Sequence, residues 1–180
     1  MILYRKTNDF TALTTEGDSF TLSNYKGHKI FLSFLRNGAC ALCNLRVQEI
    51  KKRYHEFESA GIKIVCVFES SVEDMKPYVG KQQVPFPLLS DPIGKFYELF
   101  NVETSQEKVN AVIASGKAHQ LLEQAAAAGF PTIKQEGSNF FRMPAEFLIN
   151  ESFEIAIAHY SAQFDHLPLD EVLQYGLKKK

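Results

Sequence analysis

Residues 29–60, KIFLSFLRNGACALCNLRVQEIKKRYHEFESA, decide the fold of this chain. The segment opens with a nearly continuous run of apolar and aromatic residues, which is typical of a strand covered on both faces. Beyond this run, apolar side chains follow the spacing of one helix face at Val47, Ile50, Tyr54 and Phe57. We therefore predict a central strand over 29–35, followed by a helix over about 40–60 that Gly61 ends.

The flanking sequence alternates further strands and helices. Residues 10–23 alternate apolar with polar side chains on both sides of Glu16-Gly17-Asp18, which predicts a hairpin. The downstream pattern predicts strands at 62–68 and within 84–92, and helices from Ser70, over 93–100 and from Leu169. It also predicts a helical stretch at 105–128 broken at Ser115-Gly116, a loop at 129–139, and a second hairpin at 145–158. Together these elements predict an α/β fold in which a mixed sheet is flanked by helices.

Composition narrows the class of protein. Hydrophobic residues make up 45% of the 180 residues and charged residues 23%, a balance that supports one domain with a substantial core. The net charge of -1 comes without a basic stripe, so we expect no nucleic-acid partner. No stretch reaches the roughly 18 apolar residues of a membrane span, and the first residues lack a signal-peptide core, so we expect no membrane association and a cytoplasmic location.

Two of the three cysteines, Cys40 and Cys43, lie three positions apart at the expected start of a helix. That spacing puts both thiols on one face within disulfide reach, and the helix N-terminus favours a thiolate there. The pair therefore supplies a nucleophile and a resolving thiol. A zinc site would need four ligands, yet Cys66 lies in an apolar strand and no histidine is suitably spaced, so we expect neither metal nor cofactor. Two ordinary, partly buried cysteines are the other alternative.

The stretch GDSFTLSNYKGHKIFLSFLRNGACALC at 17–43 resembles the opening of the alkyl hydroperoxide reductase / thiol-specific antioxidant (AhpC/TSA) group, the peroxiredoxin-like branch of the thioredoxin superfamily. The resemblance extends to 61–65, 85–94, 143–150 and 165–168. It implies a thioredoxin-like fold over residues 1–180, with 103–140 as a helical insertion. It also implies a thiol-dependent redox enzyme.

The family motif P-x-x-x-T-x-x-C carries a proline that shields the reacting cysteine and a threonine that orients the peroxide. Its spacing places Arg36 at the proline, Cys40 at the threonine and Cys43 at the peroxide-reacting position. Two of the three motif residues are therefore changed. A thioredoxin-type alignment assigns the roles the other way, with Cys40 attacking and Cys43 resolving. The sequence leaves both assignments open.

Other residues have supporting roles in this interpretation. The resemblance makes Arg142 a stand-in for the second arginine of the family and puts Pro144 near the cis-proline turn that faces the CxxC motif. Arg36 is either a charge that stabilises a thiolate or peroxide oxygen, or a solvated strand end. We expect His159 and His166 to be structural.

The favoured function is a thiol redox enzyme that cycles Cys40 and Cys43 between dithiol and disulfide. Its substrate is a hydroperoxide or a protein disulfide, and its reductant is a thiol donor such as a thioredoxin-like protein. The alternative is a redox sensor or binding module that uses the same disulfide without turnover. The apolar stripe of the insertion predicts that it covers the active-site face or forms a homodimer contact.

Overall fold

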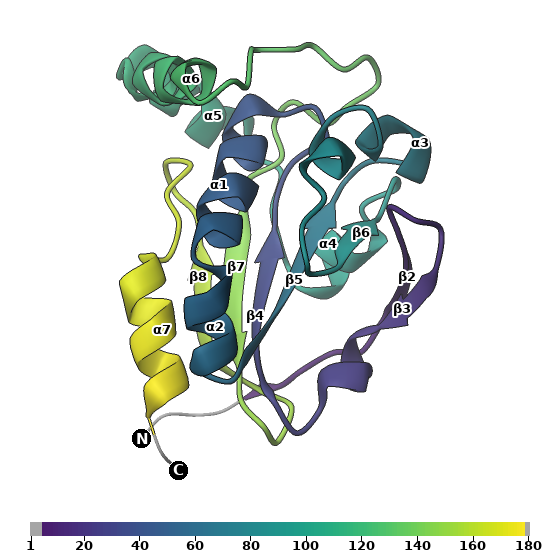
Figure 1. Cartoon of the computed structure of the whole chain (residues 1–180). Helices are drawn as coiled ribbons and strands as arrows, with labels where there is room; N and C mark the ends of the chain where they lie inside the picture. The colour runs from purple at the N-terminus through teal and green to yellow at the C-terminus, as the bar shows by residue number, and fades with distance from the viewer. Residues whose placement is uncertain (1–4, 179–180) are drawn as a thin grey trace.

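A single twisted sheet runs through the structure, a computed structural model that describes residues 5–178 (Figure 1). Its strand order is β1-β8-β7-β4-β5-β6-β2-β3. Strands β4, β5 and β6 are parallel, and the other pairings are antiparallel. The strands are β1 (Arg5–Lys6), β2 (Thr11–Thr14), β3 (Ser19–Thr21), β4 (Lys29–Phe34), β5 (Ile62–Phe68), β6 (Leu88–Ser90), β7 (Ala145–Ile149) and β8 (Glu154–Tyr160).

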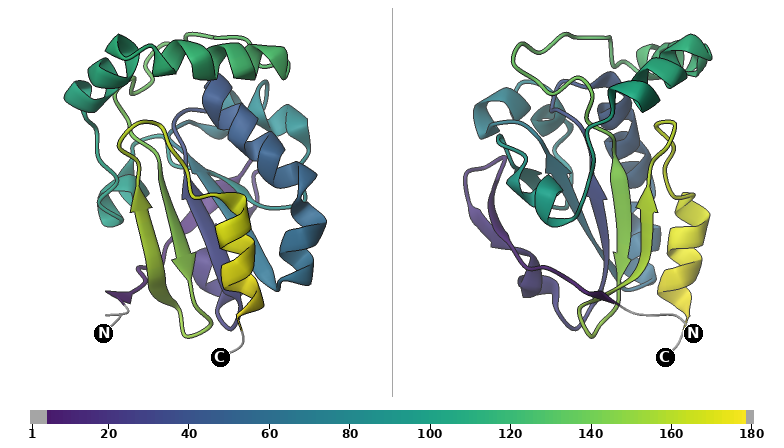
Figure 2. Two further views of the ribbon diagram at one scale, coloured as in Figure 1. Left: turned by 90° about the vertical axis from the view of Figure 1, so that its left-hand side faces the viewer. Right: turned by 180° about the vertical axis from the view of Figure 1, so that it is seen from behind.

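Helices cover both faces of this sheet, and two more lie across one end of it (Figure 2). They are α1 (Ala41–Lys52), α2 (Tyr54–Ser59), α3 (Val72–Met75), α4 (Lys95–Leu99), α5 (Gln106–Ala114), α6 (Lys117–Ala127) and α7 (Leu169–Leu177), with short 3-10 helices at Leu22–Tyr25 and Val79–Gln82. Helix α1, the longest, has 12 residues. Within residues 5–178, no helix has the length and apolar character needed to cross a membrane.

The sheet separates two apolar cores. Alternating residues of β4 point to opposite faces, so Phe31 packs with Ile50 of α1 and Phe57 of α2, while Phe34 packs on the other side with Tyr97 of α4. All five side chains are fully buried. This double coverage explains why the sequence of β4 is nearly all apolar, and it confirms the predicted central strand.

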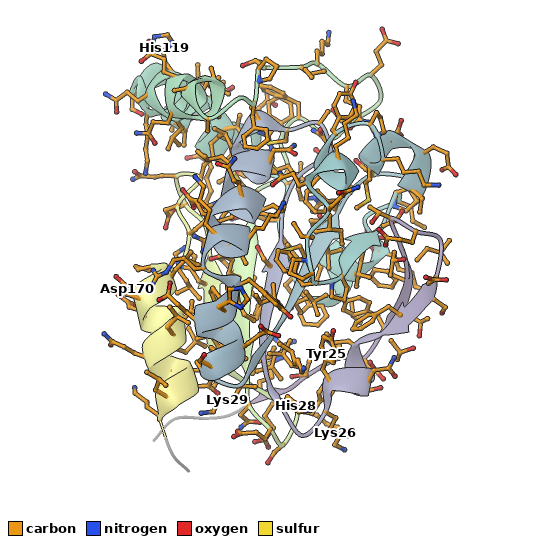
Figure 3. All side chains as sticks on the ribbon, in the orientation of Figure 1. Tyr25, Lys26, His28, Lys29, His119 and Asp170 are labelled. Carbon is orange, nitrogen blue, oxygen red and sulfur yellow. The ribbon has the colours of Figure 1, made fainter. Side chains whose placement is uncertain are left out.

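Helix α7 is attached to the body of the protein at both of its ends (Figure 3). Near its start, Asp170 pairs with Arg53 at 2.8 Å. Near its end, the ammonium group of Lys29 donates to the backbone oxygens of Tyr175, Gly176 and Lys178. A cation at this position also compensates the negative end of the helix dipole.

A buried carboxylate, Glu146 of β7, connects the sheet to α1. Arg46 of α1 donates to both of its oxygens, at 2.9 and 2.8 Å, and also to the backbone oxygen of Leu167. Ser33 donates at 3.1 Å, and His166 Nδ1 lies 3.1 Å from Oε1. Burial alone raises the pKa of Glu146, but the charges of His166 and Arg46 and their hydrogen bonds outweigh it and lower the pKa to about 2.

The mixed sheet flanked by helices and the hairpin β2–β3 confirm the predicted fold class. The predicted interruption at Ser115-Gly116 is where α5 ends and α6 begins. One prediction was wrong, because the helix expected over 40–60 is two helices. The backbone leaves the helical conformation at Arg53 (φ -105°, ψ 11°), whose N–H bonds back to Ile50 in a tighter turn and whose side chain pairs with Glu56 and Asp170.

We predict that Arg46→Met lowers the free energy of unfolding by about 3–5 kcal/mol, because it leaves the Glu146 carboxylate buried without its partner. Arg53→Met is the matched control, because its carboxylate partners are exposed, and we expect it to cost about 1 kcal/mol or less. Urea denaturation followed by circular dichroism measures both values. Equal, small losses in the two variants would contradict the role of the buried pair.

The same network predicts how stability depends on pH. Glu146 has a folded-state pKa of about 2, below the unfolded value of about 4.3. Its contribution is therefore fully present above about pH 5 and is lost as the pH falls toward 2. In Glu146→Gln, the difference in unfolding free energy from the natural protein should shrink across this window. A constant difference between pH 6 and pH 3 would refute the assignment.

Candidate active site

Both cysteines of the CxxC motif lie where the loop after β4 leads into α1. Cys40 is the residue that caps the N-terminus of α1, and its sulfur accepts the backbone N–H of Cys43 at 3.4 Å. The loop before it folds tightly because Asn37 accepts from the N–H groups of Ala39 and Cys40. Gly38 lets the loop pack closely on Met75, since a β-carbon there would lie only 3.0 Å from the Met75 backbone.

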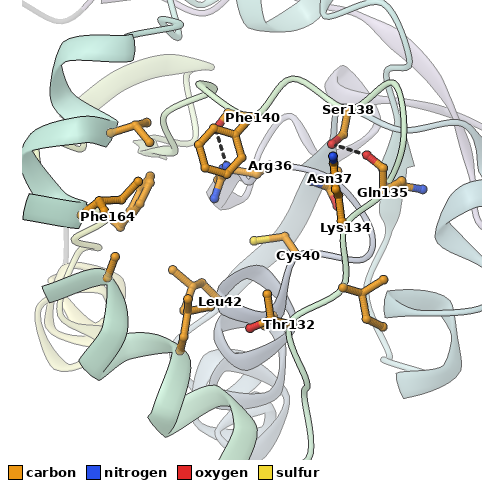
Figure 4. Close-up of a pocket in the computed structure, with 16 residues that line it drawn as sticks. Arg36, Asn37, Cys40, Leu42, Thr132, Lys134, Gln135, Ser138, Phe140 and Phe164 are labelled. Atoms are coloured by element: carbon orange, nitrogen blue, oxygen red, sulfur yellow. Dashed lines mark hydrogen bonds between the residues drawn. The ribbon is translucent and has the colours of Figure 1, made fainter. Parts of the chain in front are cut away.

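The two thiols are held differently. Cys40 Sγ points into a cavity (Figure 4). Cys43 does not line this cavity, and its Sγ accepts the backbone N–H of Arg36 at 3.2 Å. Both residues are buried, with Cys40 8% exposed and Cys43 3% exposed, and both are free thiols. Of the pair, therefore, only Cys40 is presented to a ligand.

The surroundings move the pKa values of the two thiols in opposite directions. A hydrogen bond from the Cys43 thiol, the charge of Arg36 and the N–H groups of Cys43 and Leu42 lower the pKa of Cys40 to about 6, although burial opposes them. Burial raises the pKa of Cys43 well above its usual value, and the hydrogen bond it donates to Cys40 adds to this effect. Near neutral pH the site therefore holds a thiolate on Cys40 and a protonated thiol on Cys43.

Arg36 is half-buried between two aromatic rings. Its guanidinium carbon lies 5.0 Å from the ring centre of Phe164 and 5.5 Å from that of Phe140, both distances typical of cation–π contacts. Its Nη2 also donates to the backbone oxygen of Phe140. These contacts hold the positive charge at the edge of the cavity, so Arg36 is not a solvated strand end.

The cavity above Cys40 has a volume of about 360 Å³. Helices α5 and α6 form one wall, and the loop over 132–140 forms another (Figure 4). Most of the lining is apolar, including Leu42, Val109, Ile113, Leu122 and Phe164. A molecule that reaches Cys40 from this side must therefore pass through a largely apolar space.

Two of the predicted supporting residues lie away from this cavity. Arg142 forms a two-point ion pair with Glu69 at 2.7 and 2.8 Å and stacks over Tyr97. Pro144 is not in a cis-proline turn, because no peptide bond in residues 5–178 is cis. The prolyl carbonyl instead accepts from Ser161 at the start of the loop that carries Phe164.

The remaining sulfur and histidine groups lie in the body of the protein. Cys66 is fully buried in β5, and burial raises the pKa of its thiol. His159 pairs with Asp165 at 3.0 Å, and His166 lies beside Glu146. None of these three residues lines the cavity. In residues 5–178, no cluster of three or more His, Cys, Asp or Glu side chains is arranged to hold a metal ion.

Sequence reasoning missed Phe140, Phe164 and Lys134, which border the cavity but lie in loops without periodic patterns. Only Phe164 carries a local signal. It follows Ser161-Ala162-Gln163 and adopts a left-handed backbone conformation (φ 57°) within a turn whose N–H groups and Ser161 hydroxyl bond to Asp165. That turn fixes the aromatic ring beneath Arg36.

Comparison with known proteins shows that the chain belongs to the AhpC/TSA family, whose model matches residues 4–156. A putative peroxiredoxin of Mycobacterium tuberculosis is 25% identical over 83 residues, covering 46% of this chain and 53% of that protein. Peroxiredoxin Q of Sedum lineare is 30% identical over 82 residues, covering 46% of this chain and 44% of that protein. The chain thus spans about half the length of these relatives.

Solved structures agree with the thioredoxin-like fold. The crystal structure of peroxidoxin BcpB from Mycobacterium tuberculosis superimposes with a TM-score of 0.68 at 15% identity, covering 98% of this chain and 96% of that one. At this level of identity the match concerns the fold. The family resemblance and the fold class predicted from sequence are both confirmed.

We predict that Arg36→Gln raises the pKa of Cys40, because it removes a positive charge that stabilises the thiolate. The pH midpoint of the iodoacetamide alkylation rate of Cys40, read by mass spectrometry, should move upward from about 6. Lys52→Gln removes the same charge at the far end of α1 and should leave the midpoint in place. Equal midpoints in all three proteins would show that Arg36 does not act on the thiol.

Proposed function

We propose that this protein is a thiol-dependent reductase of small organic hydroperoxides, with Cys40 as the attacking thiolate and Cys43 as the resolving thiol. One observation carries the proposal. The thiol with the lowered pKa faces the cavity, and the second thiol donates a hydrogen bond to it from behind. This arrangement reverses the roles that the family motif gives to the two positions.

The chemistry needs no group beyond the two thiols and an external dithiol. The Cys40 thiolate attacks the terminal oxygen of the hydroperoxide, the O–O bond breaks, and the alkoxide leaves and takes a proton. Cys40 becomes a sulfenic acid, and the hydroperoxide is reduced to an alcohol. The Cys43 thiol then attacks the Cys40 sulfur, an S–S bond forms, and water leaves. A dithiol donor returns two electrons and two protons.

The enclosure of Cys40 favours a small molecule as the substrate. With 8% of its surface exposed, Cys40 meets ligands only through the cavity between α6 and the loop over 132–140. A disulfide on a folded protein would have to displace these elements first. The order of the pKa values nevertheless matches the thioredoxin-type assignment, so reduction of protein disulfides is the second candidate.

Further parts of the proposal concern the protein as a whole. A thioredoxin-like donor is the proposed reductant, and we propose a cytoplasmic location and a homodimeric state. We also propose that the chain forms a single domain and that residues 103–140 are a helical insertion within it. The function of this insertion is to enclose Cys40. A sensor that uses the same disulfide without turnover differs from the enzyme in one respect, because it would not consume peroxide repeatedly.

The proposal is tested by mixing the reduced protein with cumene hydroperoxide, hydrogen peroxide or hydroxyethyl disulfide. Because the chain has no tryptophan, the reaction is followed by quenching and mass spectrometry. We expect cumene hydroperoxide to react fastest and to yield a Cys40–Cys43 disulfide, seen as the loss of two hydrogen atoms from the peptide. Dithiothreitol in excess should sustain repeated turnover.

Single-cysteine variants identify the roles of the thiols. Cys40→Ser should react at the background rate, whereas Cys43→Ser should accumulate a sulfenic acid on Cys40 that dimedone traps. Cys66→Ser is the matched control and should behave like the natural protein, because Cys66 lies outside the cavity. Dimedone labelling found only on Cys43, or no consumption of any hydroperoxide, would contradict the proposal.

A further inference from the structure

Within residues 5–178, Arg36 forms no salt bridge with a carboxylate. In the same part of the chain, its buried Nε has no hydrogen-bond partner. The other buried arginines, Arg46 and Arg142, each bind a carboxylate at two points. Arg36 therefore differs from them in keeping its charge available to the cavity.

A second cation borders the same cavity. Lys134 lies on the loop over 132–140 (Figure 4), is exposed, and forms no ion pair within residues 5–178. Among residues 5–178, no aspartate or glutamate lines the cavity. The one anionic group of the described lining is the Cys40 thiolate, so the two cations Arg36 and Lys134 leave the cavity with a net positive charge, over a space that is otherwise walled by apolar side chains.

We propose that Arg36 and Lys134 are specificity-determining residues that make this cavity select apolar molecules carrying a carboxylate over neutral molecules of the same size. This inference rests on the proposed function, whose substrate it narrows to an apolar acid with a hydroperoxide group. The apolar walls of the cavity contact the hydrocarbon part of the ligand, and Arg36 and Lys134 bind its carboxylate. The 360 Å³ volume is at the lower end of the range for small-molecule sites, which suits a ligand about the size of a substituted benzoate.

The two cations contribute in different ways. Arg36 is fixed between Phe140 and Phe164, so it can meet an anion without ordering a flexible side chain first. Lys134 is exposed, so solvent weakens its attraction. We therefore expect Arg36 to dominate the affinity for the acid, with a smaller contribution from Lys134.

Binding is tested without turnover, on the Cys40→Ser protein, by calorimetric titration with 4-isopropylbenzoate and with its neutral isostere 4-isopropylbenzamide. We expect the benzoate to bind about tenfold more tightly than the amide. Arg36→Gln in this background should remove the preference, and Lys134→Gln should weaken the benzoate about threefold without changing the amide. Lys52→Gln, a control far from the cavity, should change neither.

Steady-state kinetics of the active protein test the same preference for a carboxylate, with cumene hydroperoxide and its 4-carboxy derivative as substrates. The carboxylated substrate should have the higher kcat/KM, and Lys134→Gln should reduce its advantage through KM alone. Equal affinities for benzoate and benzamide would overturn the inference even if both hydroperoxides are reduced. Selective benzoate binding without any peroxide reduction would instead support the inference about the ligand and refute the proposed function.

Discussion

The salt bridge between Arg46 and Glu146 is the interaction on which the placement of the reactive thiols depends. Arg46 lies one turn beyond Cys43 on α1, and Glu146 lies in the strand next to β4. Two hydrogen bonds at 2.9 and 2.8 Å therefore fix the first turns of α1 over the end of the central strand. A buried pair of this kind is stable only if its remaining polar atoms are satisfied, and Ser33, His166 and the backbone of Leu167 do this.

The same network also positions the wall of the cavity. Arg46 and Glu146 both bond to the backbone of Leu167, at the end of the loop that carries Phe164. Phe164 in turn contacts Arg36, whose charge lowers the pKa of Cys40. The buried pair, the aromatic wall and the thiolate thus form one connected set of contacts, which links stability of the fold to reactivity at the helix N-terminus.

The sequence predicts the elements of this protein better than it predicts the contacts between them. Apolar runs were sufficient to predict the strands β4 and β5, and helical spacing was sufficient to place the CxxC motif at the start of a helix. Gly116 marked the break between α5 and α6. The break at Arg53 carries no glycine or proline in the sequence; there the backbone N–H bonds back to Ile50 and the side chain pairs with Glu56 and Asp170. The lining of the cavity could not be predicted from the sequence either, since Arg36, Phe140 and Phe164 come together only through tertiary folding. Glu146 is a charge inside an apolar strand, but neither its burial nor its pairing with Arg46 was predicted from the sequence.

The central claim is that Cys40, and not Cys43, is the thiolate at neutral pH. Titration of the reduced protein with ¹³Cβ-labelled cysteine, followed by NMR and assigned with Cys66→Ser and Cys43→Ser, measures the individual thiols directly. If the claim is correct, the Cys40 signal titrates with a midpoint near pH 6 while the Cys43 signal stays in its protonated position through pH 9. A Cys43 signal that titrates first would contradict it and would return the attacking role to the position that the family motif assigns.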